Sequence, residues 1–338
     1  MTTVTRHKSE KIDLAIQEQP RRDLSVMDLA VVIVNWNTCD LLRDCLRSVY
    51  ASLDVLDVEI LVVDNASSDG SAAMVENEFP GVRLITNHDN RGFAAANNQA
   101  MKLSSGRYVL LLNPDTIVAP DTLNRMIRYA DENPDAAVIG CQVYETEHCI
   151  QQTCFRYPDP VNTLLIETGL SRLFSGSRLF GRSWMGDWDR RTEREVDVVS
   201  GMFMLVRCEA IEQVGFMDED YFIYAEEADW CHRFRRAGWR CVFTPAARII
   251  HRDGGGKSTE QMSVRMYVQM QKSLLMFQRK NLGRMAWLMS WLIYVISTSL
   301  RTVLWTGLGV LRIGTRSAHR RQQAAAALRF HLTGREPV

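Results

Sequence analysis

Neither sign of charge dominates this chain, which has forty basic and forty acidic side chains among its 338 residues. The balance gives no overall field that would attract nucleic acid, so we expect no nucleic-acid partner. The eight cysteines include no CxxC pair and no spacing typical of a disulfide framework, which indicates reduced thiols in the cytoplasm. The first 26 residues contain no long apolar run of the kind that a secretion signal requires. We therefore expect residues 1–28 to be a disordered tail.

Two common nucleotide-binding signatures are also missing. The segment NRGFAAANN (90–98) has a glycine before an expected helix, but it lacks the GxGxxG spacing of a dinucleotide-binding dehydrogenase. The segment HRDGGGKS (251–258) ends like a P-loop, yet His251 stands where the first P-loop glycine belongs. The sequence therefore argues against a dehydrogenase and a P-loop NTPase. Lys257, Ser258 and the glycine N–H groups could still bind an anion.

Short apolar runs alternate with helical patterns from residue 29 onwards, which predicts a largely parallel, doubly wound α/β sheet. We expect strands at 29–34, 59–64, 82–86, 108–112 and 136–140, and helices at 41–49, 94–103 and 120–134. After about residue 142 the pattern loosens. There we expect a strand pair or one long bent strand at 195–207, a helix at 218–238 and an extended segment at 240–250.

Polar side chains follow three of the expected strands. Asn35 ends the first, Asp64 and Asn65 end the second, and Asn113 and Asp115 follow the buried run YVLLL. Ligands of open α/β sheets bind beyond the carboxyl ends of the strands. Because three such tips share this position, the sequence predicts a polar ligand at that edge of the sheet.

A cluster of acids, Glu226, Glu227 and Asp229, lies among aromatic residues in the segment YFIYAEEADW. On a helix, Glu226 and Asp229 share a face, and Asp229 can pair with Arg233 four residues on. A solvated helix face would also have this pattern, but the aromatic neighbours favour a lined cleft. A carboxylate that is shielded in this way can have its pKa raised towards the range of a general base.

In this order the segments resemble the family 2 glycosyltransferases of the GT-A fold, in the bacterial branch that contains rhamnosyltransferases. The resemblance covers about residues 29–260 and rests on VVIVNWN, VVDNASSDGS, NRGFAAANN, LLLNPDT, SGMFMLVR, GFMDEDYFIYAEEADWCHR and HRDGGGKS. It implies a doubly wound mixed sheet and inverting transfer of a sugar from a nucleotide donor to a glycan or a polyprenyl-diphosphate-linked sugar, in cell-wall or surface polysaccharide synthesis. L-rhamnose from dTDP-rhamnose is the first expectation for the donor.

The resemblance also implies a metal site. Asn113-Pro114-Asp115 matches the family's DxD position, with asparagine in place of the first acid. Asp115 is then expected to bind a divalent metal on the donor's diphosphate, with His251 as the second protein ligand. Oxygen-rich ligation with one imidazole suits Mn²⁺ or Mg²⁺.

Further roles come from the same resemblance. Asn35, Asp64 and Asn65 are expected at the base and ribose of the nucleotide, and Gly92 and Asn97 in its pocket. Asn113 stands at the family's DxD position, and Lys257 is expected to help stabilise the departing diphosphate. Ser258 stays, with Lys257, an anion-binding residue expected from the segment HRDGGGKS. Glu227 falls where the family places its catalytic base, usually an aspartate, and Glu226 and Asp229 remain alternatives for that role.

The C-terminal part differs in character from the rest. Residues 285–300 carry no charge, Arg301 interrupts the run, and Arg279, Lys280 and Arg284 precede it. Ser290, Tyr294, Ser297 and Arg301 recur at helical spacing, so the sequence favours an amphipathic helix lying in the inner face of the cell membrane. A true span, a helix packed on the catalytic domain and a homodimer contact are the alternatives.

We therefore expect a disordered tail (1–28), a GT-A catalytic domain (29–265) and a helical, membrane-associating region with a basic tail (266–338). A nucleotide-sugar-binding protein without catalysis is the alternative function. A nucleotidyltransferase would carry a glycine-rich, basic loop after the first strand, where this chain has NWNTCD.

Overall fold

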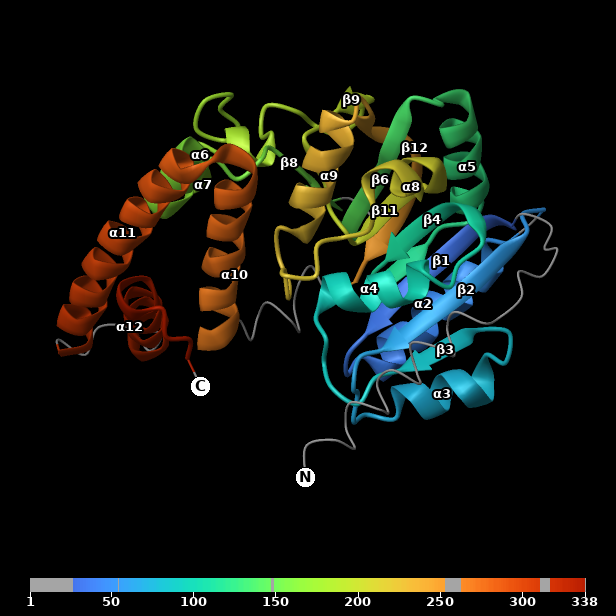
Figure 1. Ribbon diagram of the computed structural model, residues 1–338, viewed down its shortest axis with the longest axis horizontal. Coiled ribbons are helices and arrows are strands. Elements are labelled where there is room, and N and C mark those ends of the chain that lie inside the picture. Colours follow the sequence, from blue (N-terminus) through green and yellow to red (C-terminus); the bar gives the residue numbers. More distant parts are fainter. Residues whose placement is uncertain (1–26, 54, 147–148, 253–262, 311–316, 338) are drawn as a thin grey trace, which may run out of the picture.

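The computed structural model describes residues 27–53, 55–146, 149–252, 263–310 and 317–337. Among these, ten strands form one mixed sheet in the order β3-β2-β1-β4-β11-β6-β12-β5, with β7 paired to β6 and β9 to β12 (Figure 1). A small second sheet joins β8 and β10. The strands are β1 (Met27–Asn35), β2 (Val58–Asp64), β3 (Arg83–Thr86), β4 (Gly106–Leu112), β5 (Thr116–Val118), β6 (Ala136–Thr146), β7 (Cys149–Ile150), β8 (Cys154–Phe155), β9 (Arg194–Glu195), β10 (Val198–Val199), β11 (Phe203–Arg207) and β12 (Arg240–His251).

The parallel half of the sheet fixes where the strands end. β1 pairs in parallel with β2, with Asn35 opposite Asp64, and with β4, with Ile33 opposite Leu112. Residues 29–33 of β1 are at most 1% exposed, because helices cover both faces and favour a continuous apolar run. The carboxyl ends of β1, β2 and β4 therefore lie side by side and form one rim of the sheet.

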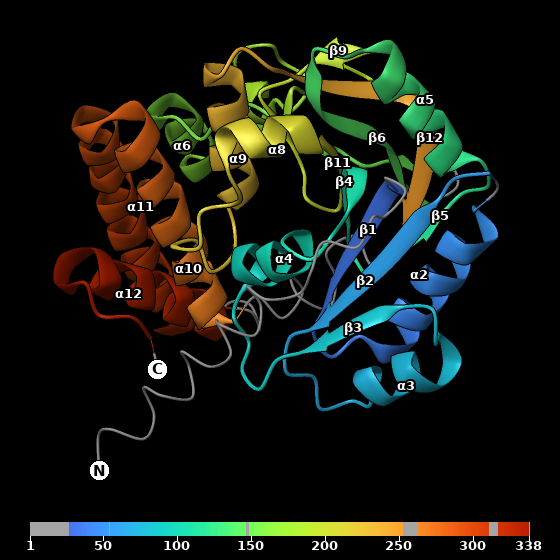
Figure 2. The same ribbon diagram turned by 45° about the vertical axis from the view of Figure 1, so that its right-hand side comes forward.

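Two apolar cores form on the two faces of the sheet. Helices α2, α3 and α5 cover one face, and α4, α8 and α9 cover the other (Figure 2). The helical pattern predicted for α2 consists of Leu41, Leu42, Cys45, Leu46 and Val49; the last four are fully buried and Leu41 is half-buried. The helices of these layers are α2 (Cys39–Ala51), α3 (Ser71–Glu78), α4 (Phe93–Met101), α5 (Thr122–Glu132), α8 (Cys208–Val214) and α9 (Glu226–Arg236).

Two predictions for the second half need correction. Residues 195–207 form neither a strand pair nor one bent strand, because β9, β10 and β11 pair with three different parts of the structure. The helix predicted at 218–238 begins only at Glu226. Tyr224 and Ala225 have positive φ angles of 70° and 68°, which are incompatible with a right-handed helix. Hydrophobic periodicity does not reveal such a turn.

The C-terminal helices pack against one another beside the sheet, on the left in Figure 1. They are α10 (Val264–Phe277), a π-helical turn η3 (Gln278–Leu282), α11 (Arg284–Val310) and α12 (Ser317–Thr333), and α11 packs on α6 (Pro160–Glu167). Two short helices, α7 (Leu170–Leu173) and η1 (Arg182–Trp184), follow α6 in the chain. α10 packs on the core of the sheet, because Phe277 is fully buried in the cluster that holds Trp230 and Phe234. The domain boundary near residue 265 stays a prediction, and the tail expected at 1–28 lies almost wholly outside the described residues.

The position of Phe277 generates a stability prediction. Phe277→Ala should lower the free energy of unfolding by about 3–5 kcal/mol, because it leaves a cavity between α10 and the core of the sheet. Urea denaturation followed by far-UV circular dichroism measures this change. Leu332→Ala on α12 is the control, since Leu332 is 61% exposed and its loss should change stability by no more than about 0.5 kcal/mol. Equal stability of the two variants would show that α10 folds apart from the sheet.

Candidate active site

The rim formed by β1 and β2 is held by buried polar contacts. The Asn35 side-chain N–H donates to Asp64 Oδ1 at 3.0 Å, and Asp64 Oδ2 accepts from the Ser67 backbone N–H at 3.0 Å. Thr38 Oγ1 donates to Asn35 Oδ1 at 2.6 Å. Asn35 and Asp64 are buried, so these two predicted nucleotide-binding residues also fix the loops beside them. Both residues lie at the carboxyl ends of their strands, where the sequence predicts the ligand-binding edge of the sheet.

The loop at residues 87–93 is attached to the same rim by Asn65. The Asn65 side chain donates to Asn90 Oδ1 at 2.9 Å and accepts from the Arg91 backbone N–H at 3.0 Å. Gly92 has φ +82°, and a Cβ there would lie 2.2 Å from the Phe222 carbonyl oxygen. Position 92 therefore requires glycine, because the segment before α9 approaches it too closely for a side chain. The Asn97 amide donates to the Phe93 carbonyl inside α4 at 2.9 Å.

Asp115 and His251 meet at the end of the rim. β5 pairs with β12 in antiparallel fashion, and this pairing places His251 opposite Thr116. His251 Nε2 lies 3.1 Å from Asp115 Oδ2, and His251 Nδ1 is 3.0 Å from Gln151 Oε1. The backbone N–H of Arg252 donates to the Asp115 carbonyl at 3.0 Å. The two predicted metal ligands are therefore neighbours, although they are far apart in sequence.

The Asp115–His251 pair could supply two of the ligands of a metal ion. Asp115 Oδ1 is buried and has no hydrogen-bond partner among the described residues. Two cis ligands about 2.1–2.2 Å from an octahedral ion are about 3 Å apart, which matches the observed separation. Gln151 holds the other imidazole nitrogen, as outer partners of metal-binding histidines usually do. Within the described part of the chain, no group of three or more His, Cys, Asp or Glu side chains could hold a metal. These two residues therefore fit an ion that takes its other ligands from phosphate and water.

Glu227 of α9 lies beside the loop that follows β10. The Asn113 backbone N–H donates to the Met202 carbonyl at 3.0 Å, which ties the end of β4 to this loop. The neighbouring Gly201 faces Glu227, because a Cβ there would lie 3.8 Å from Glu227 Cγ. Burial raises the pKa of the Glu227 carboxyl above its ordinary value, against the lowering effect of hydrogen bonds from backbone N–H groups, including that of Gly201.

The three acids of the cluster have different surroundings. Asp229 is bound to Arg233 Nε at 2.8 Å and to the Asn281 amide at 2.8 Å, so its charge is already paired. Glu226 is buried, its Oε2 has no partner among the described residues, and burial raises its pKa. Glu227 is half-buried, and its side chain faces Gly201. These contacts favour Glu227 over Asp229 as a group that exchanges protons with a ligand.

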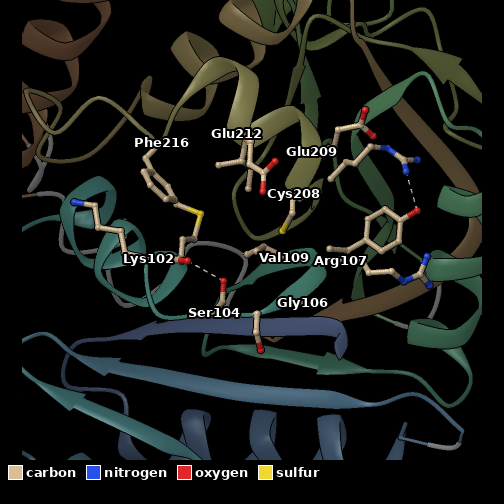
Figure 3. A pocket seen from close by; sticks show the side chains of 14 residues that line it. Lys102, Ser104, Gly106, Arg107, Val109, Cys208, Glu209, Glu212 and Phe216 are labelled. Atoms are coloured by element: carbon tan, nitrogen blue, oxygen red, sulfur yellow. Dashed lines mark hydrogen bonds between the residues drawn. The ribbon is translucent and has the colours of Figure 1, made fainter. Parts of the chain in front are cut away.

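A cavity of about 800 Å³ lies away from this rim, at the start of β4 (Figure 3). It is lined by residues such as Arg107, Cys208 and Glu212, and it contains none of the predicted site residues. Its basic groups already have partners: Lys102 pairs with Glu219 at 3.5 Å, and Arg107 pairs with Asp131 at 3.0 Å. Since β4 runs away from this cavity towards Asn113, the cavity and the rim are at opposite ends of the strand.

Three residues join the site that residue-type reasoning did not single out. Ser67 and Gly201 belong to the segments DNASSDGS and SGMFMLVR, so their neighbourhood was recognisable although their roles were not. No sequence pattern marks Gln151 as a site residue, because only the pairing of β12 with its neighbours brings His251 close to it. Lys257 and Ser258 lie outside the described residues.

Comparison with known proteins gives a consistent set of relatives. A family model described as glycosyl transferase family 2 matches residues 30–215. An N-acetylglucosaminyl-diphospho-decaprenol L-rhamnosyltransferase of Mycobacterium tuberculosis is 28% identical over 208 residues, which is 57% of this chain and 66%, just under two thirds, of that protein. The rhamnosyltransferase WbbL of Escherichia coli K12 is 25% identical over 227 residues, covering 65% of this chain and 82% of that protein.

The fold has solved counterparts. A mannosyltransferase of Pyrobaculum calidifontis, determined with GDP-mannose and Mn²⁺, superposes with a TM-score of 0.54 over 98% of this chain and 95% of its own, at 17% identity. This likeness confirms the GT-A fold predicted from the sequence.

The geometry of the pair predicts how metal binding responds to substitution. Asp115→Asn and His251→Gln should each weaken Mn²⁺ binding by more than about tenfold, and Gln151→Ala by about tenfold, because it frees the imidazole ring. Electron paramagnetic resonance of free Mn²⁺, with and without a nucleoside diphosphate, measures the affinity. Asp89→Asn on the exposed 87–92 loop is the matched control and should bind as the wild type does. Wild-type affinity in Asp115→Asn would exclude the site.

Proposed function

Because this chain belongs to glycosyl transferase family 2, we propose that it is an inverting glycosyltransferase that uses a sugar nucleotide as donor. The observation that supports the proposal is the contact of Asp115 with His251 beyond the end of β4, together with the link from that strand end through Met202 and Gly201 to Glu227, a shielded carboxylate. The first arrangement suits the diphosphate of a donor, and the second suits the hydroxyl of an acceptor. Asp115 belongs to the first half of the chain, and His251 and Glu227 belong to the second, so the fold itself assembles the two functions.

In the proposed reaction Glu227 takes the proton from the acceptor hydroxyl while that oxygen attacks the anomeric carbon of the donor sugar. The bond from the anomeric carbon to the diphosphate breaks in the same step, and the nucleoside diphosphate leaves. Asp115 and His251 would hold Mn²⁺ or Mg²⁺, which when bound neutralises negative charge on the leaving diphosphate. Asn35, Asp64 and Asn65 shape the loops against which the nucleoside rests, and Asn113 stands between these loops and Asp115.

For the substrates we propose L-rhamnose from dTDP-rhamnose as donor sugar and a polyprenyl-diphosphate-linked sugar as acceptor, in surface polysaccharide synthesis. Two of the relatives are named rhamnosyltransferases, and one of these names specifies a decaprenol-linked acceptor. An acceptor of that kind places the enzyme at the inner face of the cell membrane. The long apolar helix α11 supports this location.

A panel of sugar nucleotides tests the reaction. The full-length protein with Mn²⁺ is incubated with each donor and a polyprenyl-diphosphate-linked acceptor, and released nucleoside diphosphate and glycosylated product are both measured. We expect dTDP-rhamnose to give the fastest transfer. Binding of a donor without any transfer would instead support a nucleotide-sugar-binding protein of the same fold.

Substitution within the acid cluster should separate the base from its neighbours. Glu227→Gln should lower kcat by about 10²–10⁴-fold with nearly unchanged donor affinity, because a general base acts in the transition state. Steady-state kinetics and donor binding measured by calorimetry give these two quantities. Asp229→Asn should mainly reduce thermal stability, because it leaves Arg233 without its ionic partner. A larger fall in kcat for Glu226→Gln than for Glu227→Gln would assign the base to Glu226.

The raised pKa of Glu227 also predicts the pH dependence of the reaction. The base works only when it is ionised, so kcat/KM should fall as the pH drops through the pKa of Glu227. Because burial raises that pKa, the acid limb should lie above about pH 4.3, the ordinary value for glutamate. Rates measured from pH 4 to 9 locate the limb, with donor binding at each pH as the control. An acid limb at or below the ordinary glutamate pKa would argue against a shielded base.

A further inference from the structure

Helix α11 exposes an apolar stripe along its length. The stripe, which we define as Met285, Met289, Leu292, Ile296, Leu300 and Val303, recurs every three or four residues and lies on one face of the helix. It spans about 27 Å at 1.5 Å per residue. By length and composition α11 is apolar enough to cross a membrane, yet only 17% of its most apolar window is buried. An apolar surface of this extent marks an interaction site.

The polar side chains of α11 point the other way, into the protein. Arg301 pairs with Glu167 of α6 at 3.0 Å, and Ser297 Oγ donates to the same carboxylate at 2.6 Å. Ser290 and Thr298 are fully buried. The predicted polar stripe is therefore real, but it packs on α6 instead of facing water or lipid headgroups.

The same inversion extends to the neighbouring helices. Gln271 and Gln278 of the α10–η3 segment are buried, and His331 Nε2 of α12 is 2.7 Å from Gln271 Oε1. This helical unit thus has polar groups between its helices and apolar groups outside. Polar groups inside and apolar groups outside are the arrangement expected of helices in contact with lipid.

Charge identifies the surface that would cover the stripe. From Val264 to the end the chain carries twelve lysines and arginines and one acid, Glu336. Arg279 stacks over Trp287 at 5.9 Å before the stripe, and Arg320 stacks over Trp305 at 4.9 Å beyond its other end. Tryptophan and arginine together favour the headgroup region of a membrane.

We propose that the apolar stripe of α11 is a docking surface for an anionic lipid bilayer, on which the helix lies in the membrane plane. An in-plane position follows from packing, because α11 contacts α6, α10 and α12 with the face opposite the stripe. A span would carry the Glu167–Arg301 pair and the catalytic body into the bilayer with it. The inference holds whether or not the proposed transfer reaction is correct, since docking needs no sugar nucleotide.

The test measures binding of the full-length protein to vesicles. Wild type is mixed with phosphatidylglycerol-containing and with pure phosphatidylcholine vesicles, and the bound fraction is read by flotation. We expect binding to the anionic vesicles, weakening as salt is raised, and release from the bilayer at alkaline pH. Retention at alkaline pH would overturn the in-plane arrangement.

Matched variants locate the docking surface. Ile296→Asp and Leu300→Asp should each reduce partitioning by about tenfold or more, because a carboxylate would enter the acyl region. Val55→Asp makes the same charge change at an 82% exposed site far from α11, and its partitioning should stay within about twofold of wild type. Circular dichroism should show all three folded, since each site is exposed.

Two results would overturn the proposal. One is equal vesicle binding by Ile296→Asp and Val55→Asp. The other is a wild-type dimer in lipid-free analytical ultracentrifugation that becomes a monomer in Ile296→Asp, which would make the stripe a contact between copies of this chain. Donor binding by Ile296→Asp, measured in parallel, keeps this question separate from the proposed reaction.

Discussion

The candidate site depends on the antiparallel pairing of β5 with the last residues of β12. β5 follows Asp115 directly, and β12 carries His251 at its end. This pairing, extended by the hydrogen bond from the Arg252 N–H to the Asp115 carbonyl, aligns two side chains that belong to distant parts of the sequence. β12 has a register irregularity between Phe243 and Arg248 and stays paired with β6 on both sides of it. An ion pair between Arg252 and Asp44 joins the residue that follows β12 to α2.

The sequence predicted the parallel half of the fold well, and the reasons are local. Residues 29–33 and 109–112 are apolar on both faces, and their polar tips mark where the strands end. The side of the sheet on which Asn35, Asp64 and Asn113 meet followed from strand direction alone. The roles of individual acids came from resemblance, and the surroundings of Asp229 and Glu227 now give that choice a physical basis.

What the sequence did not predict arises from long-range packing. Gln151 reaches His251 only through the sheet, and Gly201 reaches Glu227 only through the loop beside β11. Tyr224 and Ala225 adopt left-handed backbone angles although neither is glycine, so the residue types did not predict a turn there. The polar stripe of α11 was recognised, but its partner Glu167 could not be, because a sequence pattern does not say which side of a helix meets protein.

The C-terminal helices also hold the segment that presents the acids. Ser273 of α10 donates to the Ile223 carbonyl at 2.8 Å, and Asn281 of η3 donates to Asp229. Lys280 contacts Asp218 and Asp220 on the same segment. α11 begins directly after η3, so the proposed docking surface and the turn before α9 are joined through one short stretch of chain. A shift of the helical unit would therefore change the position of Glu227.

The segregation of charge has a consequence for how the protein behaves in solution. With twelve basic side chains and one acid after residue 263, residues 1–263 are left with 28 basic and 39 acidic side chains. The neutral total therefore conceals a large electric dipole moment between the two ends. At low ionic strength the basic end of one molecule attracts the acidic body of another, whereas high salt removes this attraction and leaves the exposed apolar stripe to drive self-association. Colloidal stability should therefore be greatest at intermediate ionic strength.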